Sequence, residues 1–575
     1  MKSAASVSSL SVIRGIPLDQ EQALGALTLP GYLREVTARY PEREALVMHE
    51  DSGTTRWSYA ELWEQSMAVA RALNACGIGK GERVGVMMTN RPEWLSGCFG
   101  ATLAGGIATG ISTFSTPAEL DYLLKSSGVS VLLLERKVLK KDFAQILFEL
   151  EPLIVSAGPG KIQSTRYPFL KYLACVGDGE GSIEDWTSFL QRGESVPREI
   201  IEATAATVTP ADPGLLFFSS GSTNKPKGIM NAHRGVCLQL WRWLRFYGML
   251  QPPGDDVSRV ADDVRCWSAN GFFWSGNFAQ ALGGALSSGG SLVLQSTFIA
   301  DEALRLMEQE KVTLAVAWPH QWKQLEEAAN FASVNLASLH YVDPSTPLGR
   351  HPTVNTTWQE PMAAYGNTET FTISTIFPSG TPRERINKSS GEPQPGNVFK
   401  IVDPLTGEVL PMGERGEIAV KGPTLMLGYL GVPLEETLDD QGFFRTGDGG
   451  YVDAGNRLYW EGRLNDIIKT GGANVSPLEI DDVIRAHPGV KVTLTVGVPH
   501  DTLGEIVVAC IVPFDNASLD EQTVREFAKE KLASYKVPRR VLFFREAELA
   551  TTGSSKIKSG ELRKLAAQRL AGATD

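Results

Sequence analysis

Strand-like and helix-like patterns alternate along the first part of the chain, and this alternation constrains the fold more than any other feature. A capping box at residues 58–61 begins a helical pattern of apolar residues that stops before Gly77. The segments that follow predict a strand at 84–88, helices at 92–104 and 116–128, and a strand at 129–134. Strands separated by single helices form βαβ units, so the sequence predicts a largely parallel sheet.

A second alternating run follows Gly228. It predicts helices at 232–246 and 278–286, a strand at 291–294, a helix at 301–310 and a strand at 312–316. The two runs together predict two α/β sheet subdomains within one large N-terminal body. The stretch between them, residues 136–212, is rich in glycine, proline and charge, and we expect it to form surface connections.

The C-terminal part of the chain has a different pattern. Turns and short strands at 391–462 predict a small β-rich subdomain. Beyond it, alternating apolar residues predict strands at 492–498 and 506–512, and a capping box at 518–521 predicts a helix. The predicted fold class is α/β, with a loose N-terminal tail at 1–28, a large N-terminal domain at 29–462 and a smaller α+β C-terminal domain at 463–575.

Composition excludes several functional classes. A chain of 575 residues is longer than one hydrophobic core supports, and its net charge of −11 argues against nucleic-acid binding. The six cysteines form no C-x-x-C pair and the seven histidines no H-x-x-x-H pair, so we expect reduced thiols and no zinc site. No apolar run reaches the roughly 18 residues that cross a bilayer, and the Ser-rich start lacks the apolar segment of a signal peptide. We therefore expect a cytoplasmic protein without a transmembrane segment.

Residues 219–228 (SSGSTNKPKG) are the strongest candidate for binding chemistry. They follow the apolar run 215–218, which reads as a buried strand. Hydroxyls, lysines and flexible glycines are the groups that wrap a polyphosphate. The G-x-x-x-x-G-K-[ST] pattern of a Walker loop is absent. Taken alone, the stretch also fits an ordinary polar loop.

Four later stretches place functional side chains beside glycines. They are an aromatic ring, a hydroxyl and a carboxylate in 365–369 (YGNTE), a carboxylate in 442–448 (GFFRTGD), an arginine and a glycine pair in 461–472 (EGRLNDIIKTGG), and a lysine in 551–558 (TTGSSKIK). Each stretch by itself also fits a plain role as a turn, a surface charge or an interdomain salt bridge.

In this order and at these spacings, the five stretches resemble the motifs of the adenylate-forming superfamily. That superfamily includes acyl-CoA synthetases, firefly luciferase and the adenylation domains of nonribosomal synthetases. The resemblance extends from about residue 29 to residue 565. It implies an AMP-forming acid–thiol ligase of the acyl-CoA synthetase branch, with ATP and CoA as substrates and Mg²⁺ as a cofactor.

The resemblance also implies a nucleotide site. Lys227 and the loop hydroxyls would hold the β- and γ-phosphates, Tyr365 would stack on adenine, Asp448 would accept both ribose hydroxyls, and Arg463 would hold ribose and phosphate. The complete set that it implies for ATP is Ser219, Ser220, Gly221, Ser222, Thr223, Asn224, Lys225, Lys227, Ser345, Thr346, Tyr365, Gly366, Asn367, Thr368, Glu369, Asp448, Arg463 and Lys556.

The implied catalytic groups are Lys556, Thr223, Lys227 and Glu369. Glu369 and Thr223 would ligate Mg²⁺, Thr368 would contact the α-phosphate, and Lys556 would meet both the α-phosphate and the attacking carboxylate. Attack of a carboxylate on the α-phosphate gives acyl-AMP and pyrophosphate. Because the nucleophile is already an anion, the reaction needs positioning and charge neutralisation, and it needs no general base.

For the second half-reaction, the resemblance implies that the C-terminal domain is mobile and rotates about a hinge at Asn465. The rotation would withdraw Lys556 and present a different surface to the thiol of CoA. The residues implied for CoA are Thr470, Gly471, Gly472 and Lys536.

Three positions depart from the family pattern. Asn224 stands where glycine is usual, and asparagine tolerates the left-handed backbone that glycine supplies there. Ser555 replaces the glycine before Lys556, which leaves Lys558 as the second candidate for the catalytic lysine. The hinge is Asn465, where aspartate or lysine is commoner.

We expect the acid pocket in residues 267–276. Its candidate residues are Asn270, Phe272, Phe273, Trp274, Ser275 and Gly276. This stretch contains no acidic residue to pair the ammonium of an amino acid, and burying that cation unpaired is costly. The aromatic and small residues favour a fatty acid or a ring-bearing acid, although some of these rings equally fit the core.

CoA is the acceptor that we expect, because no carrier-protein domain follows residue 565 in this sequence. Three alternatives stay open. The first is an acyl-AMP ligase that loads a separate carrier protein. The second is a luciferase-like oxygenase, which shares all of these motifs. The third is a non-catalytic nucleotide-binding relative. The sequence predicts no nucleic-acid partner and leaves the oligomeric state open.

Overall fold

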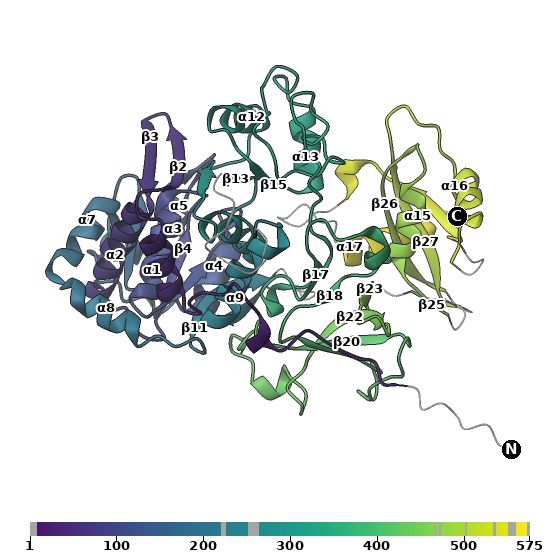
Figure 1. The fold of residues 1–575 in the computed structure, drawn as a ribbon, viewed down its shortest axis with the longest axis horizontal. Helices are drawn as coiled ribbons and strands as arrows, with labels where there is room; N and C mark the ends of the chain where they lie inside the picture. The colour runs from purple at the N-terminus through teal and green to yellow at the C-terminus, as the bar shows by residue number, and fades with distance from the viewer. Residues whose placement is uncertain are drawn as a thin grey trace. The chain divides into compact units, whose positions relative to one another are not determined.

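The computed structural model describes residues 9–219, 226–250, 264–464, 466, 468–470, 473–500, 503–532, 536–549 and 559–571. The chain divides into two compact units. Unit 1 combines Met1–Ile13, Val398–Val420 and Gln441–Asp575, and unit 2 combines Arg14–Asn397 and Lys421–Asp440. Figure 1 shows the helices and strands of both units.

Unit 2 is built around an eight-stranded sheet. Its strands, in spatial order, are β10 (Ile183–Asp185), β9 (Tyr172–Val176), β6 (Val131–Glu135), β4 (Arg83–Met87), β5 (Ile107–Gly110), β11 (Pro213–Ser219), β12 (Lys227–Ala232) and β21 (Gly428–Tyr429). Pairing is parallel from β10 to β11 and antiparallel from β11 to β21. The predicted parallel sheet is therefore confirmed.

Helix α3 packs on β4 and β5, and α1 and α2 pack on α3 (Figure 1). The helices of unit 2 include α1 (Leu29–Arg39), α2 (Tyr59–Ala75), α3 (Pro92–Leu103), α4 (Pro117–Ser127), α5 (Phe143–Leu150), α7 (Trp186–Gln191), α8 (Arg198–Ala206) and α9 (His233–Phe246). The predicted capping box of α2 is present, because Glu61 N–H donates to Ser58 Oγ (3.1 Å) and Ser58 N–H donates to Glu61 Oε2 (2.6 Å). Gly128 ends α4 in the left-handed conformation.

A second sheet in unit 2 has five strands. In spatial order these are β15 (Leu314–Val316), β13 (Arg265–Ser268), β14 (Ser291–Leu294), β2 (Glu44–Glu50) and β3 (Gly53–Ser58). Helices α12 (Ala300–Gln309) and α13 (Pro319–Glu326) belong to the same region. The two α/β sheets that the sequence predicts are confirmed, and β2 and β3 join the second one from far upstream in the chain.

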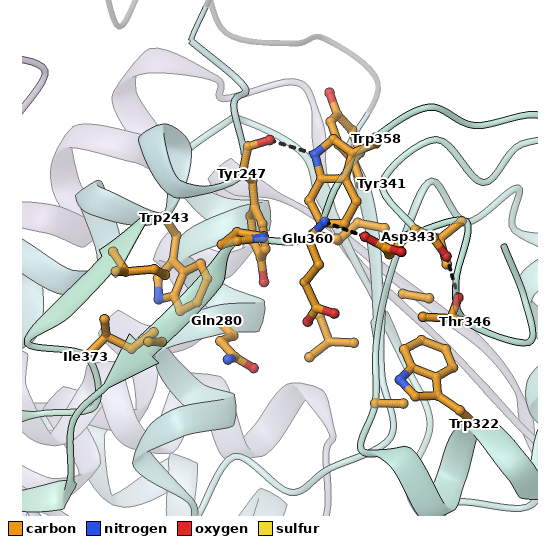
Figure 2. A pocket seen from close by; sticks show the side chains of 18 residues that line it. Trp243, Tyr247, Gln280, Trp322, Tyr341, Asp343, Thr346, Trp358, Glu360 and Ile373 are labelled. Carbon is orange, nitrogen blue, oxygen red and sulfur yellow. Dashed lines mark hydrogen bonds between the residues drawn. The ribbon is translucent and has the colours of Figure 1, made fainter. Parts of the chain in front are cut away.

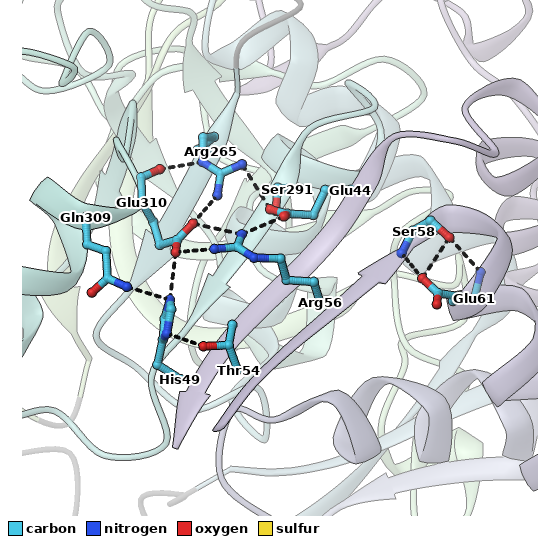
Figure 3. A network of polar contacts seen from close by, with 10 residues as sticks. All are labelled: Glu44, His49, Thr54, Arg56, Ser58, Glu61, Arg265, Ser291, Gln309 and Glu310. Carbon is cyan, nitrogen blue, oxygen red and sulfur yellow. Dashed lines mark hydrogen bonds and ion pairs between the residues drawn. The ribbon is translucent and has the colours of Figure 1, made fainter. Parts of the chain in front are cut away.

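A charge network fastens the β2–β3 hairpin to this second sheet (Figure 3). The Glu310 carboxylate, whose side chain is 4% exposed, accepts hydrogen bonds from Arg56 Nη2 (2.6 Å) and Arg265 Nη2 (2.7 Å). It also lies 2.6 Å from His49 Nε2. Burial alone would raise the pKa of Glu310, but hydrogen bonds from Arg56 and His49 and the nearby arginine charges hold it below its usual value.

Two further sets of strands carry the remaining motifs. A three-stranded sheet of unit 2 contains β16 (Met362–Tyr365), β17 (Thr375–Phe377) and β18 (Glu392–Pro393). In unit 1, a five-stranded sheet contains β1 (Val12–Arg14), β19 (Val398–Val402), β20 (Gly416–Lys421), β22 (Phe444–Val452) and β23 (Leu458–Arg463).

The C-terminal part of unit 1 is the predicted α+β unit. Its elements are β24 (Ile468–Thr470), β25 (Ala473–Val475), α15 (Pro477–Arg485), β26 (Val490–His500), β27 (Gly504–Pro513), α16 (Glu521–Lys529), β28 (Arg540–Phe543) and α17 (Ser559–Ala571). β26 and β27 pair antiparallel, as the alternating apolar residues predict. The cap of α16 differs from the prediction, because Asp520 accepts from Thr523 N–H (2.7 Å) and thereby takes the position expected for Ser518.

The N-terminal segment departs from the loose tail that we expected at 1–28. Residues 12–14 form β1 on the unit 1 sheet, and Ile13 is buried. Within unit 2, the Glu21 carboxylate accepts hydrogen bonds from Arg242 Nε (2.9 Å) and Nη2 (2.8 Å), and both side chains are 1% exposed. A buried ion pair holds its chain segment in place because neither charge tolerates the loss of its partner.

The connecting stretch 136–212 also differs from our expectation of surface connections. It supplies β9 and β10 to the eight-stranded sheet, together with helices α5, α7 and α8. Its strands are short and pair with each other and with β6, and such short strands carry little periodic signal in the sequence. The expected domain boundary at 462/463 lies inside unit 1 and stays a prediction.

The Glu310 network gives a test of the fold. Glu310→Gln should lower the free energy of unfolding by about 1–3 kcal/mol, because Arg56 and Arg265 lose a charged acceptor. Since the folded-state pKa of Glu310 is depressed, this contribution is present at neutral pH and is lost as the pH falls through that folded pKa.

Thermal unfolding of both proteins, followed at neutral and acidic pH, measures this difference. The matched control is Glu302→Gln in the first turn of α12, the helix that Glu310 caps, and its exposed side chain should matter by less than about 0.5 kcal/mol. Equal melting temperatures for wild type and Glu310→Gln at neutral pH would contradict the assignment.

Candidate active site

The predicted phosphate loop joins two strands of the eight-stranded sheet. β11 and β12 pair antiparallel so that Ser219 lies opposite Lys227. The two residues that frame the loop are therefore neighbours at one end of the sheet. The loop residues Ser220, Gly221, Ser222, Thr223, Asn224 and Lys225 lie outside the described residues.

Tyr429 connects this loop to the predicted metal-binding carboxylate. It belongs to β21, which pairs with β12 beyond the loop. Its hydroxyl donates to Glu369 Oε1 (2.7 Å), and Lys227 Nζ lies 4.7 Å from the centroid of its ring. The sequence analysis did not single out Tyr429, because a tyrosine in a turn-rich stretch carries no local signal of this role. The structure thus brings Lys227 to the ring and Glu369 to the hydroxyl of one side chain.

The turn after β16 that carries Glu369 ends in strained backbone. Asn367 caps the short helical turn Thr368–Thr370 by accepting from Thr370 N–H (2.9 Å). Phe371 (φ +45°) and Thr372 (φ +80°) follow in the left-handed region, which non-glycine residues rarely adopt. Backbone at this energy persists only where neighbouring groups enforce it.

Gly366 is required by this turn. A Cβ atom added there would lie 1.7 Å from the Thr372 carbonyl oxygen. Beside it, Tyr365 is 6% exposed at the end of β16. Met426 N–H donates to the Glu369 carbonyl oxygen (2.7 Å) and holds the other side of the turn. The predicted residues Tyr365, Gly366, Asn367, Thr368 and Glu369 therefore form one locked turn.

The predicted adenine-pocket residues lie on a second turn. Ser345 donates through its backbone N–H (2.8 Å) and its hydroxyl (2.6 Å) to Asp343 Oδ1, and Thr346 Oγ1 donates to the Asp343 carbonyl oxygen (2.8 Å). Partial burial would raise the pKa of Asp343, but the hydrogen bonds from Ser345 lower it. Asp343 is therefore ionised at neutral pH.

A cavity of about 180 Å³ lies beside this turn (Figure 2). Thr346 and Ala364, the residue before Tyr365, both line it. The aromatic side chains on its wall are Trp243, Tyr247, Trp322, Tyr341 and Trp358, and the polar ones include Gln280, Asp343, Thr346 and Glu360. The sequence analysis did not find this cavity, since its walls come from segments between residues 243 and 376.

The residues predicted for the acid pocket occupy other places. Phe272 is packed in the core, with its ring 5.3 Å from that of Trp94. Phe273 and Trp274 lie 5.7 and 5.8 Å from the ring of Phe114. The expected set was Asn270, Phe272, Phe273, Trp274, Ser275 and Gly276; all six are described, and none lines the cavity. From this region the cavity takes Gln280, and the predicted acid pocket stays a prediction.

In unit 1, the predicted ribose-binding pair is formed. Asp448 on β22 lies opposite Arg463 on β23, with Arg463 Nε 3.2 Å from Asp448 Oδ1. Arg463 Nη1 also donates to the Thr446 carbonyl oxygen (2.7 Å). The Asp448 side chain is 5% exposed and that of Arg463 is 49% exposed, so the pair has a buried end and an open end.

The remaining predicted residues are in the C-terminal part of unit 1. Thr470 ends β24 and is buried, and Lys536 Nζ donates to both carboxylate oxygens of Glu479 (2.6 Å each). The predicted hinge, glycine pair and catalytic lysine lie outside the described residues: Asn465, Gly471, Gly472 and Lys556.

Two kinds of feature are absent from the residues that the structure describes. There, no group of three or more His, Cys, Asp or Glu side chains is placed to hold a metal ion by itself. In the same ranges, no helix combines the length and the apolar character needed to cross a bilayer. All six cysteines are described, buried and unpaired.

Comparison with known proteins agrees with this geometry. The family model described as AMP-binding enzyme matches residues 33–430, and the model of the AMP-binding enzyme C-terminal domain matches residues 479–556. A medium-chain acyl-CoA ligase of Danio rerio, described as mitochondrial, is 27% identical over 95% of this chain and 89% of its own length. A feruloyl-CoA synthase of Amycolatopsis is 29% identical over 92% of this chain and 97% of its own length.

Among solved structures, an anthranilate CoA ligase bound to anthranoyl-AMP superposes with a TM-score of 0.76. Its sequence is 24% identical to this one, and the match covers 96% of this chain and 98% of the other. At this identity the likeness concerns the fold. It confirms the predicted α/β architecture.

The locked turn gives a test of the site. Gly366→Ala should weaken the binding of ATP·Mg²⁺ about tenfold or more, because the added Cβ displaces the turn that carries Thr368 and Glu369. Titration calorimetry measures the affinity, and circular dichroism confirms that the variant folds. The matched control is Gly79→Ala, where nothing lies within 4 Å of an added Cβ. Unaltered affinity in a folded Gly366→Ala protein would show that this turn does not contact the nucleotide.

Proposed function

The chain belongs to the AMP-binding enzyme family, and on that premise we propose that it is an ATP-dependent ligase that converts a carboxylic acid to acyl-AMP and then to acyl-CoA. The observation that carries this proposal is the pairing of Lys227 and Glu369 across Tyr429, at the mouth of the phosphate loop. A cation and a carboxylate on one rigid support suit a polyphosphate and its counter-ion. Relatives named as acyl-CoA ligases support the same reaction.

The reaction has two steps. In the first, a carboxylate oxygen of the acid forms a bond to the α-phosphorus of ATP, and the bond from that phosphorus to the bridging oxygen breaks to release pyrophosphate. In the second, the CoA sulfur bonds to the acyl carbon, AMP leaves and the thiol proton is lost. Both steps bring anions together, so positioning and cationic groups supply the catalysis.

Lys227 would neutralise the β- and γ-phosphates in the first step. Lys225 and the hydroxyls of Ser219, Ser220, Ser222 and Thr223 would share this task by virtue of the family resemblance. Lys227 can reach the phosphates because its aliphatic chain extends from the end of β12, beside Tyr429.

Glu369 fits a role in holding Mg²⁺. One of its oxygens accepts from Tyr429, and no described residue donates to the other. Mg²⁺ prefers one or two carboxylates together with phosphate oxygens and water, which matches a site with few protein ligands. When bound, the ion neutralises negative charge on the polyphosphate.

In unit 1, Asp448 would accept the ribose hydroxyls and Arg463 would hold ribose and phosphate. Arg463 orients the nearly buried Asp448 carboxylate, and an ionised carboxylate can accept two hydroxyls. Lys556 as the catalytic lysine, Asn465 as the hinge and the pantetheine contacts at 470–472 rest on the resemblance.

CoA is the proposed acceptor, and a carrier protein is the alternative within the same chemistry. We also propose that the enzyme works in the cytoplasm, because six buried free thiols suit a reducing compartment. The named relatives act on different acids, so their names do not settle the acid of this enzyme.

Release of AMP and pyrophosphate from ATP·Mg²⁺ tests the function. A panel of carboxylic acids is assayed with and without CoA. Turnover that depends on both an acid and CoA is the expected result. Pyrophosphate release that stops near one turnover and ignores CoA would favour a carrier-protein acceptor. Nucleotide binding without pyrophosphate release, for any acid, would overturn the proposal.

Asp448→Asn tests the ribose assignment. The neutral amide is a weaker acceptor for two hydroxyls, and its NH₂ group faces Arg463, so ATP affinity should fall about tenfold. Calorimetric titration with ATP·Mg²⁺ gives the value. Asp515→Asn, an exposed position of the same unit, should bind ATP as the wild type does. Wild-type affinity in Asp448→Asn would refute the assignment.

Lys556→Ala separates the two half-reactions. Adenylation should slow about 10²–10³-fold, by analogy with the loss of one transition-state donor, while thioester formation from synthetic acyl-AMP stays near the wild-type rate. Lys558→Ala is the matched variant and should keep both rates. If Lys558→Ala shows the adenylation defect instead, the catalytic lysine is Lys558. Equal loss of both half-reactions in Lys556→Ala would refute its role.

A further inference from the structure

Glu360 places a carboxylate in the aromatic cavity of unit 2 without a protein partner. Its backbone N–H donates to Asp343 Oδ2 (3.1 Å), which fixes the start of the side chain. Figure 2 shows the side chain extending into the cavity, between Trp243 and Trp322. No described residue donates a hydrogen bond to its carboxyl group. The Glu360 side chain is exposed, although many protein atoms surround it.

Two other polar groups face the same space. The Gln280 amide lines the cavity, and no described residue hydrogen-bonds to it. Tyr247 lines it as well, with its ring 4.7 Å from that of Trp243 and its carbonyl oxygen accepting from Trp358 Nε1 (2.9 Å). Burial raises the pKa of Tyr247 well above its usual value, so its hydroxyl stays protonated and can donate.

The walls of the cavity suit a flat ring. Trp243, Trp322 and Trp358 offer broad apolar faces, and aromatic rings pack against such faces at offset or tilted angles. The volume of about 180 Å³ is close to the about 150 Å³ of a cavity that holds one benzene molecule. A single ring fits such a space.

Polar groups without a described protein partner favour a complementary ligand in this cavity. The Glu360 side chain is exposed, so water can solvate its carboxylate in the free protein. A ligand that donates to Glu360 replaces that water, and a ligand without a donor displaces it without restoring its hydrogen bonds. Sites of this kind reject the analogue that lacks the polar group more strongly than they reject a change of size.

From these observations we propose that the cavity selects a carboxylic acid with one aromatic ring that carries a hydrogen-bond donor, a hydroxyl or an amino group, and that Glu360 is the residue that recognises it. The inference rests on the proposed ligase function and narrows its substrate class. It replaces the apolar tail that residues 267–276 favour with a polar-substituted ring.

The charges also determine which end of the substrate lies near Glu360. Glu360 and the ionised Asp343 repel a second carboxylate, and burial together with the charge of Asp343 raises the pKa of Glu360. The reacting carboxylate of the acid must therefore lie away from Glu360. Ala364 and Thr346, at the border with the predicted nucleotide site, mark the end where it would emerge.

The experiment compares matched acids on the full-length enzyme with ATP·Mg²⁺ and CoA. The pairs are benzoate with 4-hydroxybenzoate and 4-aminobenzoate, and cinnamate with 4-hydroxycinnamate and 4-aminocinnamate; octanoate represents an alkyl chain. The donor-bearing member of at least one series should have a kcat/KM about tenfold or more above that of its unsubstituted partner. Comparison of the hydroxyl-substituted acids with the amino-substituted acids shows which donor the cavity recognises.

Glu360→Leu should reverse this preference. The variant should lose about tenfold or more on the donor-bearing acid and gain on the unsubstituted one, whereas Glu360→Gln, which still accepts a hydrogen bond, should keep part of the preference. Binding of the same acids, followed by thermal shift without turnover, should change in the same direction. Glu384→Leu, an exposed glutamate of α14 (Arg383–Ile386), is the matched control and should behave as the wild type.

The outcomes distinguish a failure of this substrate inference from a failure of the proposed ligase function. CoA-dependent turnover that is best on octanoate or on an unsubstituted ring, and that ignores Glu360→Leu, overturns the inference and leaves the ligase function standing. Absence of pyrophosphate release with every acid overturns the function. In that case, equal binding of hydroxy and unsubstituted acids to wild type and to Glu360→Leu would overturn the inference as well.

Discussion

The hydrogen bond from Tyr429 to Glu369 is the contact on which the arrangement of the residues predicted to bind the nucleotide depends. It joins an edge strand of the eight-stranded sheet to the locked turn after β16, and the same tyrosine ring faces Lys227. A hydrogen bond to a charged group contributes about 1.5–3 kcal/mol, enough to offset part of the strain at Phe371 and Thr372. The cation and the carboxylate are therefore set by one shared support before any ligand arrives, which lowers the reorganisation that catalysis would require.

The aromatic cavity, by contrast, contains polar groups that lack protein partners among the described residues. Its walls are apolar, but Glu360, Gln280 and Tyr247 present polar atoms that the described protein does not pair. A ligand that enters the cavity displaces the water that solvates these groups, so a ligand with complementary donors and acceptors is favoured over one without them. The substrate preference that we infer arises from this unfilled hydrogen-bonding capacity as much as from the size of the cavity.

Charge also stabilises the framework away from the site. Glu310, Arg56 and Arg265 connect the β2–β3 hairpin to β13, and Glu21 with Arg242 holds the N-terminal segment against α9. In both cases a nearly buried carboxylate meets arginine, whose planar guanidinium satisfies several acceptors at once. Because Glu21 pairs with Arg242, a residue far away in the sequence, the N-terminal segment is part of the fold.

The sequence by itself determined the class of the fold and the motifs that place the chain in its family. Some features are local, such as the helix cap of Ser58 with Glu61, the apolar strand before Ser219 and the Tyr365–Glu369 turn. Each depends on residues that are close together in the sequence, so the sequence alone can predict it. Only the tertiary structure decided the place of β9 and β10, the role of Tyr429 and the existence of the cavity that contains Glu360. These features depend on which distant segments pack together. A single glutamate or tyrosine in an irregular stretch has no sequence periodicity from which its tertiary contacts could be predicted.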